Sequence, residues 1–480
     1  MTNLSGTNLN NGAAVGPQGE GRDSPSRFPK YPAYKDSGVE WLGEVPEGWI
    51  LARGDAYLRS QAKVVSADYL GGKEVFHYSI PAVQATGDGQ LEDGDEIDSS
   101  KLLVEQPQVL ISKLNPRKNT VCLAGPREVV TVCSGEFVPL QSDCMDLKWV
   151  YYLVSSENFK KRLESLVESA TRSHQRVNPS DILKFRGAFP LLAEQTQIAR
   201  FLDHETTRID ALIEEQQRLI ELLKEKRQAV ISHAVTKGLD PTVPMKDSGV
   251  EWLGEVPAHW IISQLKFNTT EMQTGPFGSQ LHAEDYIDGG IPLINPAHMV
   301  DGRIIPDFQV SVDEETWSRL SRHALKAGEI IFARRGELGR CAVVSKDQEG
   351  WLCGTGSLKA SLNSRLSSEY AYLLVTSKGV VSELSLESKG STMENLNTET
   401  LGRVRLPLPP LSEQETILEH VHEISGQFAA LINEAEDGIK LITERRSALI
   451  SAAVTGKIDV RGWQPPVSTQ APKLEAAEAV

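Results

Sequence analysis

Apolar residues recur every three or four positions along two long segments of this 480-residue chain. In the first segment the recurring positions are Ile198, Leu202, Glu205, Ile209, Leu212, Gln216, Leu219, Leu223, Lys226 and Val230, most of them apolar. Adding 219 to each number gives the second set, which includes Leu431 and ends at Leu449. This spacing predicts two helices of about 40 residues, about 60 Å long, that pair as a coiled coil. The alternative is two separate amphipathic helices on different cores.

Shorter apolar runs lie between these segments and alternate with turn residues. The runs VLISKL (109–114), EIIFAR (329–334) and RCAVV (340–344) are typical of β-strands, whereas residues 150–166 and 368–386 have a helical pattern. Each long helix is therefore preceded by a globular region of about 140 residues that mixes helices and strands. The long helices begin after Pro190 and Pro409, and each has an acidic residue in its first turn, Glu194 and Glu413.

The chain also contains an internal repeat. Residues 35–49 read KDSGVEWLGEVPEGW and residues 246–260 read KDSGVEWLGEVPAHW, so 13 of 15 positions match at an offset of 211. FPLLAEQTQIARFL (189–202) aligns with LPPLSEQETILEHV (408–421), and ISHAVTKGLD (231–240) with ISAAVTGKID (450–459), at an offset of 219. The ends of each half repeat closely and the middles differ, which indicates two copies of one scaffold that hold two different globular regions.

The predicted fold class is α+β, with two mixed α/β domains joined by two long antiparallel coiled-coil helices in a pseudo-twofold repeat. The predicted boundaries are a disordered tail at 1–30, the first domain with its entry motif at 31–188, the first spacer helix at 189–241, the second domain with its entry motif at 242–405, the second spacer helix at 406–460, and a flexible tail at 461–480. If the two copies are equivalent, the first entry motif must pack beside residues 454–460, at the end of the second helix.

Composition narrows the choice of environment and chemistry. The net charge is −15, which gives no support to nucleic-acid binding except through local basic patches. The chain has five cysteines and no CxxC pair, which favours reduced thiols over a disulfide framework or a zinc site. No apolar run is long enough to span a membrane, and the first residues lack the pattern of a signal peptide. We therefore expect a cytoplasmic protein with no bound metal and no membrane contact.

The repeated motifs resemble the specificity subunit of type I restriction-modification systems. The resemblance rests on KDSGVEWLGEVP with its following tryptophan, on PLPPLSEQETI (407–417) and on TGPFGSQL (274–281), although the first half lacks the last element. It implies two target recognition domains that read two halves of a target in double-stranded DNA. It also implies two copies of a methyltransferase (modification) subunit and a translocating restriction subunit as partners. S-adenosylmethionine, ATP and Mg would be bound by these partners, with no cofactor in this chain.

Candidate DNA-contacting residues lie in two pairs of matching segments. Basic side chains follow a predicted strand in ISKLNPRKN (111–119) and in FARRGELGR (332–340), and these are Lys113, Arg117, Lys118, Arg334, Arg335 and Arg340. Just before each long helix lie Arg172, His174, Gln175 and Arg176 in the first half, and Ser391, Thr392 and Asn395 in the second. Arginine can contact guanine with two donors, and lysine can contact phosphate. Each of these residues is equally well explained as ordinary solvated surface.

The tryptophans of the entry motifs, Trp41, Trp49, Trp252 and Trp260, are the candidate partner-binding scaffold. The sequence has no Walker loop, no NPPY-like methyltransferase segment and no HExxH pair, so we expect a non-catalytic chain. Two alternatives remain open. One is a protein-interaction scaffold that binds no DNA, and the other is the specificity subunit of a related system whose partner fuses methylase and nuclease.

Overall fold

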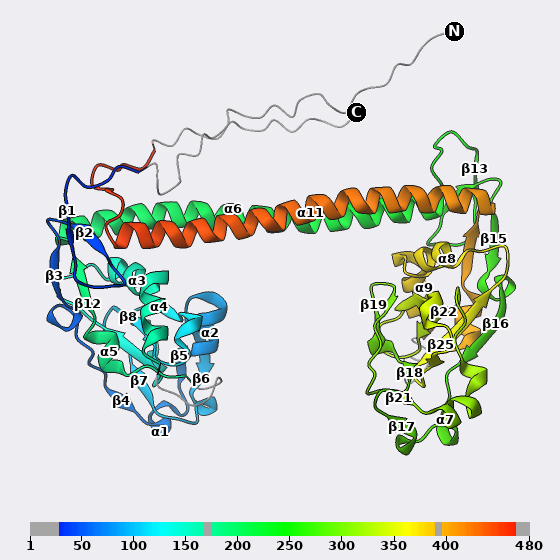
Figure 1. The fold of residues 1–480 in the computed structure, drawn as a ribbon, viewed down its shortest axis with the longest axis horizontal. Coiled ribbons are helices and arrows are strands. Elements are labelled where there is room, and N and C mark those ends of the chain that lie inside the picture. The colour runs from blue at the N-terminus through cyan, green and yellow to red at the C-terminus, as the bar shows by residue number, and fades with distance from the viewer. Residues whose placement is uncertain (1–27, 168–174, 389–395, 467–480) are drawn as a thin grey trace, which may run out of the picture. The chain divides into compact units, whose positions relative to one another are not determined.

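The computed structural model describes residues 28–167, 175–388 and 396–466 (Figure 1). It divides into two compact units, residues 1–217 with 437–480, and residues 218–436. Both boundaries fall inside the long helices α6 (Leu192–Lys237) and α11 (Leu411–Val454). Each unit therefore combines one globular domain with the start of one long helix and the end of the other.

The first unit contains a five-stranded sheet, a three-stranded sheet and two strand pairs. The five-stranded sheet has the order β4 (Val64–Val65), β7 (Lys101–Leu103), β10 (Val130–Ser134), β5 (Glu74–Tyr78), β6 (Gln90–Asp93). The three-stranded sheet has the order β11 (Phe137–Leu140), β8 (Gln108–Ser112), β9 (Val121–Ala124). The strand pairs are β1 (Tyr34–Asp36) with β2 (Glu44–Pro46), and β12 (Arg186–Phe189) with β3 (Ile50–Arg53).

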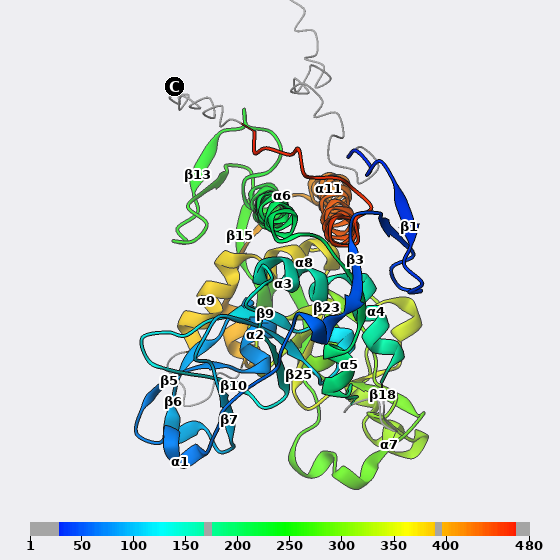
Figure 2. The same cartoon turned by 90° about the vertical axis from the view of Figure 1, so that its left-hand side faces the viewer.

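Short helices connect these sheets to the long helices. They are α1 (Ala67–Leu70), α2 (Ile80–Thr86), α3 (Leu147–Ser155), α4 (Glu157–Ser165) and α5 (Pro179–Leu183). Helix α3 packs on β8 and β9, and Figure 2 shows it between the start of α6 and β9. Trp149 of α3 is fully buried in one core cluster with Val109 of β8, Ile198 of α6 and Leu449 of α11. This cluster is the largest apolar core of the unit, and it holds the three-stranded sheet against both long helices.

The second unit repeats this plan with different lengths. Its strands are β13 (Met245–Asp247), β14 (Glu255–Pro257), β15 (Ile261–Gln264), β16 (Thr269–Thr274), β17 (Tyr286–Ile287), β18 (Ile291–Ile294), β19 (Met299–Val300), β20 (Arg303–Ile304), β21 (Ser311–Val312), β22 (Ile330–Ala333), β23 (Cys341–Val343), β24 (Leu352–Cys353), β25 (Ser357–Leu362) and β26 (Arg405–Leu408). Its short helices are α7 (Glu314–Arg319), α8 (Ser368–Val375), α9 (Lys378–Ser388) and α10 (Thr398–Arg403).

The two domains share a core topology although their sequences differ. The antiparallel order β11-β8-β9 corresponds to β25-β22-β23, and the parallel pair β5-β10 corresponds to β18-β24. In both domains two helices, a short capped helix and one strand then lead into the long helix. The segments 150–166 and 368–386, each predicted as one helical region, are two helices in both cases, with breaks at Ser156 and at 376–377.

The entry motifs occupy equivalent positions in the two units. Trp49 Nε1 donates to Glu194 Oε1 at 3.0 Å, and Trp260 Nε1 donates to Glu413 Oε1 at the same distance. A lysine at the end of the other long helix bonds the carbonyl oxygens of each motif, Lys457 to Glu44 and Lys237 to Leu253 and Glu255. The predicted contact between the first motif and residues 454–460 is thus confirmed, and the repeat extends to individual hydrogen bonds.

The long helices confirm the predicted pairing, although its register is partly wrong. Ile198, Ala199, Leu202 and Ile209 of α6 share a core cluster with Leu449, Ile450 and Val454 of α11, and in the other unit Val235 of α6 shares one with Ile417 and Val421 of α11. The start of each helix therefore packs with the end of the other, which makes the pair antiparallel. The predicted α+β fold class agrees with this arrangement.

Three predicted seam positions, Leu212, Leu219 and Leu431, are exposed, and their neighbours Ile213, Ile220 and Ile432 are more deeply buried. A straight helix with 3.6 residues per turn drifts by about 20° per heptad from a strict 3.5 repeat. Adjacent residues are about 100° apart around the helix, so the next residue lies nearer the seam after about two to three heptads. The shift leaves leucines on the outer surface of the helix pair.

In the second domain an ion pair lies inside the core. Lys359 of β25 is 2% exposed and Glu329, next to β22, is 3% exposed, with Nζ 3.2 Å from Oε1. Lys359 also donates to the Ala324 carbonyl oxygen, and Glu329 accepts hydrogen bonds from Ser361 and from the Lys326 amide. Every strong donor and acceptor of the pair is thereby engaged, so removing one partner leaves a buried charge uncompensated.

We predict that Lys359→Met lowers the free energy of unfolding by about 3–5 kcal/mol, because the Glu329 carboxylate loses its counter-charge. Denaturant titration of the full chain measures this loss. Arg403→Met removes an exposed ion pair with Glu399 and should change stability by less than about 0.5 kcal/mol. Equal losses in the two variants would contradict the prediction, and Lys359→Met with Glu329→Leu should recover part of the stability.

Candidate nucleic-acid interface

The basic segments identified from the sequence lie on equivalent hairpin loops. Residues 113–120 connect β8 to β9, and residues 334–340 connect β22 to β23. The β8–β9 hairpin belongs to the sheet β11-β8-β9 and the β22–β23 hairpin to the four-stranded sheet β16-β25-β22-β23, and every residue of β8 and β22 is buried. A loop at the end of a rigid sheet can differ between copies without changing the core, which suits a recognition surface.

The β8–β9 loop has a fixed backbone that directs its cations outward. Asn115 and Asn119 have φ of 49° and 46°, a left-handed conformation that asparagine tolerates better than most residues. They enclose one turn of 3-10 helix, Pro116–Lys118, from which Arg117 and Lys118 are exposed. Lys118 Nζ lies 3.3 Å from the Gln84 side-chain oxygen on α2. The loop therefore presents two cations on a constrained turn.

In each unit the segment before the short capped helix joins this hairpin loop. In the first unit the Val177 amide donates to the Lys113 carbonyl at 3.0 Å, and the Asn115 amide donates to the Gln175 carbonyl at 2.7 Å. In the second unit the Leu396 amide donates to the Arg334 carbonyl at 2.9 Å. The two predicted segments of each half thus meet on one surface. Five of the candidate residues lie outside the described residues: Arg172, His174, Ser391, Thr392 and Asn395.

The candidate cations differ in how they are held. Arg176 forms two hydrogen bonds with Glu136, with NH2 2.8 Å from Oε1, and Lys113 Nζ donates to the Gly135 carbonyl on the same turn. Arg340 bonds Glu337 with NH2 at 2.6 Å, and Arg334 Nε donates to the Leu396 carbonyl. Arg335 is exposed on its loop. Arginines paired with carboxylates are less available to phosphate than the exposed cations of the first loop.

Residues that the sequence analysis did not select also reach this surface. Gln84 of α2 donates from Nε2 to Thr120 at 2.9 Å, in addition to its contact with Lys118. Pro296, which follows the parallel strand β18 as α2 follows β5, accepts a 3.4 Å hydrogen bond from Arg340. Both segments contain a proline directly after an apolar strand, SIPAV and INPAH, and this shared turn signal is what could have identified them.

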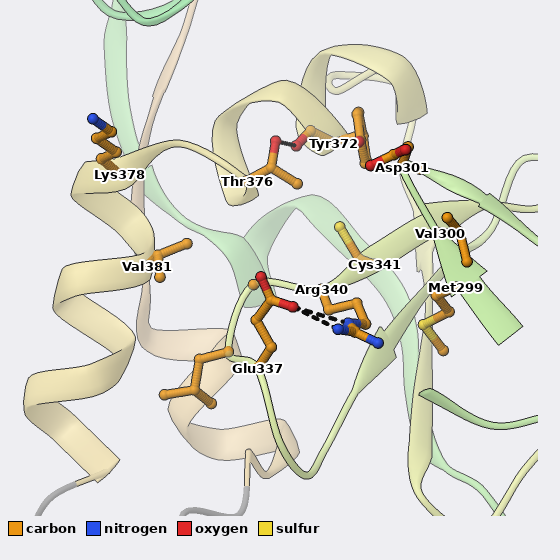
Figure 3. Close-up of a pocket in the computed structure, with 13 residues that line it drawn as sticks. Met299, Val300, Asp301, Glu337, Arg340, Cys341, Tyr372, Thr376, Lys378 and Val381 are labelled. Atoms are coloured by element: carbon orange, nitrogen blue, oxygen red, sulfur yellow. Dashed lines mark hydrogen bonds and ion pairs between the residues drawn. The ribbon is translucent and has the colours of Figure 1, made fainter. Parts of the chain in front are cut away.

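The second domain has a pocket beside its loop, with a volume of about 460 Å³ (Figure 3). Its walls are residues 337–341 of the loop, the turn 299–302 and side chains of α8 and α9. Burial raises the pKa of the Tyr372 hydroxyl and of the Cys341 thiol, so both groups are neutral at ordinary pH. In the first unit the corresponding loop is attached to α3, because Asn119 Nδ2 donates to the Ser155 carbonyl at 2.7 Å. The two loops therefore present different shapes.

The tryptophans of the entry motifs lie inside the units or against their helices. Trp49 and Trp260 are at most 2% exposed, so burial leaves them almost no surface for a partner and they stabilise the scaffold instead. Trp41 packs on Phe159 of α4 at a ring distance of 5.8 Å, and Trp252 Nε1 donates to Glu383 of α9.

Three further properties of the described residues bear on the chemistry. Among them there is no group of three or more His, Cys, Asp or Glu side chains that could hold a metal ion. None of the helices within this part of the chain is long and apolar enough to cross a membrane. The five cysteines are free thiols, and four of them are buried.

Residues 275–441 match the family model described as the type I restriction modification DNA specificity domain. The chain is 22% identical over 456 residues to the type I restriction enzyme EcoKI specificity subunit of Escherichia coli K12, covering 88% of this chain and 91% of that protein. It is 22% identical over 430 residues to the MjaVIII specificity subunit of Methanocaldococcus jannaschii, covering 87% and 94%.

The fold is similar to that of a chain from a structural study of complex assembly and conformational transition of the type I R-M system. The TM-score is 0.62 at 16% identity, and the match covers 85% of this chain and 98% of the other. Similarity at this level of identity supports the fold, namely two mixed domains and two long helices.

We predict that Arg117→Ala with Lys118→Ala weakens binding of double-stranded DNA by the full chain. If each cation contacts one phosphate, the slope of log affinity against log salt becomes shallower by about 1.8, and affinity at 0.1 M salt falls about 60-fold. Fluorescence anisotropy with a duplex at several salt concentrations measures both quantities. Lys224→Ala with Lys226→Ala removes the same charge from α6 as a control, and a similar change in both variants would contradict a role of the loop.

Proposed function

We propose that this chain, a specificity subunit of a type I restriction-modification system, reads a two-part target in double-stranded DNA, with one domain for each part. The observation that carries the proposal is the pair of equivalent hairpin loops on domains with the same topology and different loop side chains. A common topology keeps the loops in equivalent places within their domains. Different side chains allow each loop to recognise different bases.

The proposal assigns catalysis to partner subunits. S-adenosylmethionine, ATP and Mg would be bound by those subunits, and this chain would supply sequence recognition in the cytoplasm. Methylation of a base requires its removal from the stack into a catalytic pocket.

Two copies of a methyltransferase subunit are the proposed partners of the helix pair, with a restriction subunit completing the enzyme. Exposed leucines support two docking surfaces, since Leu212 and Leu441 lie on the helices of the first unit and Leu431 and Leu222 lie at the corresponding positions of the second. Their exposed fractions range from 41% to 67%. The Asp210–Arg446 ion pair sets the local register and places Leu212 within about one turn of Leu441.

We predict that exchanging residues 261–405 for the matching region of a relative changes one half of the methylated target and leaves the other half unchanged. The reason is that this region contains the loop of the second domain and no part of the first. Methylome sequencing of cells that express the hybrid with its partner subunits reads both halves. The purified chain alone should transfer no methyl group from S-adenosylmethionine. A change in both halves, or methyl transfer by the chain alone, would refute the proposal.

A second prediction concerns the partners. Native mass spectrometry of the co-expressed complex should find two methyltransferase subunits per chain. Leu212→Glu with Leu441→Glu should reduce this number to one, because carboxylates cannot be buried in an apolar contact without cost. The matched variant, Leu431→Glu with Leu222→Glu, should do the same for the other copy. Leu91→Glu, on the exposed strand β6, serves as a control, and two copies retained in all variants would place the docking surface elsewhere.

A further inference from the structure

Each unit holds one candidate DNA-contacting arginine against a glutamate at the surface. Arg176 and Glu136 share two hydrogen bonds, at 2.8 and 3.2 Å, with side-chain exposures of 54% and 29%. Arg340 donates twice to Glu337, at 2.6 and 3.2 Å, with exposures of 39% and 69%. The two pairs arise from different sequence positions, since Glu136 lies on the β10–β11 turn and Glu337 lies within the β22–β23 loop.

Both pairs lie within the surface formed by the hairpin loops. The Lys113 amide donates to the Glu136 carbonyl, and the backbone of Arg176 bridges to Leu114, so Glu136 is attached to the β8–β9 loop from two sides. Glu337 lines the pocket beside its own loop, and Figure 3 shows it directed at Arg340. Arg340 also reaches the Pro296 carbonyl, which fixes a third donor.

Such pairs contribute little to stability, because exposed ion pairs are opposed by solvent screening and side-chain entropy. Their effect on the binding of DNA by the arginine is larger than their effect on stability. A phosphate that approaches the arginine brings a full negative charge next to the glutamate, whereas a guanine edge offers neutral acceptors. The glutamate therefore disfavours contact with phosphate more than contact with a base.

We propose that Glu136 and Glu337 are specificity-determining residues that hold Arg176 and Arg340 away from the phosphates of non-target DNA. On the target, the arginine exchanges the carboxylate for a base edge, which leaves the glutamate free to solvent. Arg117 and Lys118 have no carboxylate partner within the described residues and supply general attraction to the duplex. This inference rests on the proposed function, because it assumes that the loops read DNA.

The test compares binding to two duplexes by the full chain in complex with its co-purified methyltransferase subunits. One duplex has a random sequence and the other carries the target defined by methylome sequencing. Glu136→Gln and Glu337→Gln should each raise affinity for the random duplex about eightfold at 0.1 M salt, with a salt slope steeper by about 0.9, as expected for one added phosphate contact. Affinity for the target should rise less, so that the specificity ratio falls.

Asp143→Asn is the matched control. Asp143 pairs with Arg59 at the surface, beyond the other end of β11 from Glu136, and its loss removes the same negative charge. This variant should leave the salt slope and the specificity ratio unchanged. Thermal unfolding of all variants should match the wild type, because the pairs are exposed.

The Arg176→Gln variant tests whether Glu136→Gln acts by releasing Arg176 or only by removing a negative charge. In that background, Glu136→Gln should no longer raise affinity for the random duplex. The inference is overturned if Glu136→Gln and Glu337→Gln leave that affinity unchanged or lower it, or if the increase persists without Arg176. If the wild-type complex binds the two duplexes equally, the proposed function itself fails, whatever the glutamate variants do.

Discussion

The hydrogen bond from a buried tryptophan to the first turn of a long helix is the contact on which each unit depends. Trp49 and Trp260 are too large and too buried to leave their indole N–H groups without acceptors. Glu194 and Glu413 accept these hydrogen bonds, and their negative charges also suit the positive end of a helix dipole. One carboxylate therefore fixes the entry motif, the helix start and the angle between them.

This contact explains why the repeat is so uneven. In each unit the entry motif lies between the start of one long helix and a lysine at the end of the other, so a change in the motif disturbs three segments far apart in sequence. The loops between β8 and β9 and between β22 and β23 are attached to neighbouring segments through backbone hydrogen bonds, which do not depend on the identity of the side chains. Their backbones keep the same connection to the segment before the short capped helix, while their side chains differ. Packing thus constrains the ends of each half, and the loops can change independently.

The net charge of −15 agrees with this division of roles. DNA binding requires cations at the contact surface rather than across the whole chain. Arg117 and Lys118 are exposed on a rigid turn, where the proposed function places DNA, and carboxylates lie next to Arg176 and Arg340. A surface of mixed charge favours discrimination between DNA sequences over tight binding to any duplex, which agrees with the proposed function.

The sequence by itself determined the two halves, the long helices and the strand-to-loop position of the basic segments, because repeats and apolar periodicity are local properties. It also determined that the first entry motif meets the end of the second helix, since equivalent copies require equivalent contacts. Tertiary structure decided the rest. The drift of a straight helix moved the buried seam from Leu212 to Ile213, and long-range pairing brought Gln84 and Pro296 to the two hairpin loops. The partnership of Arg176 with Glu136 joins residues 40 positions apart, and no local pattern encodes which cation a distant turn will neutralise.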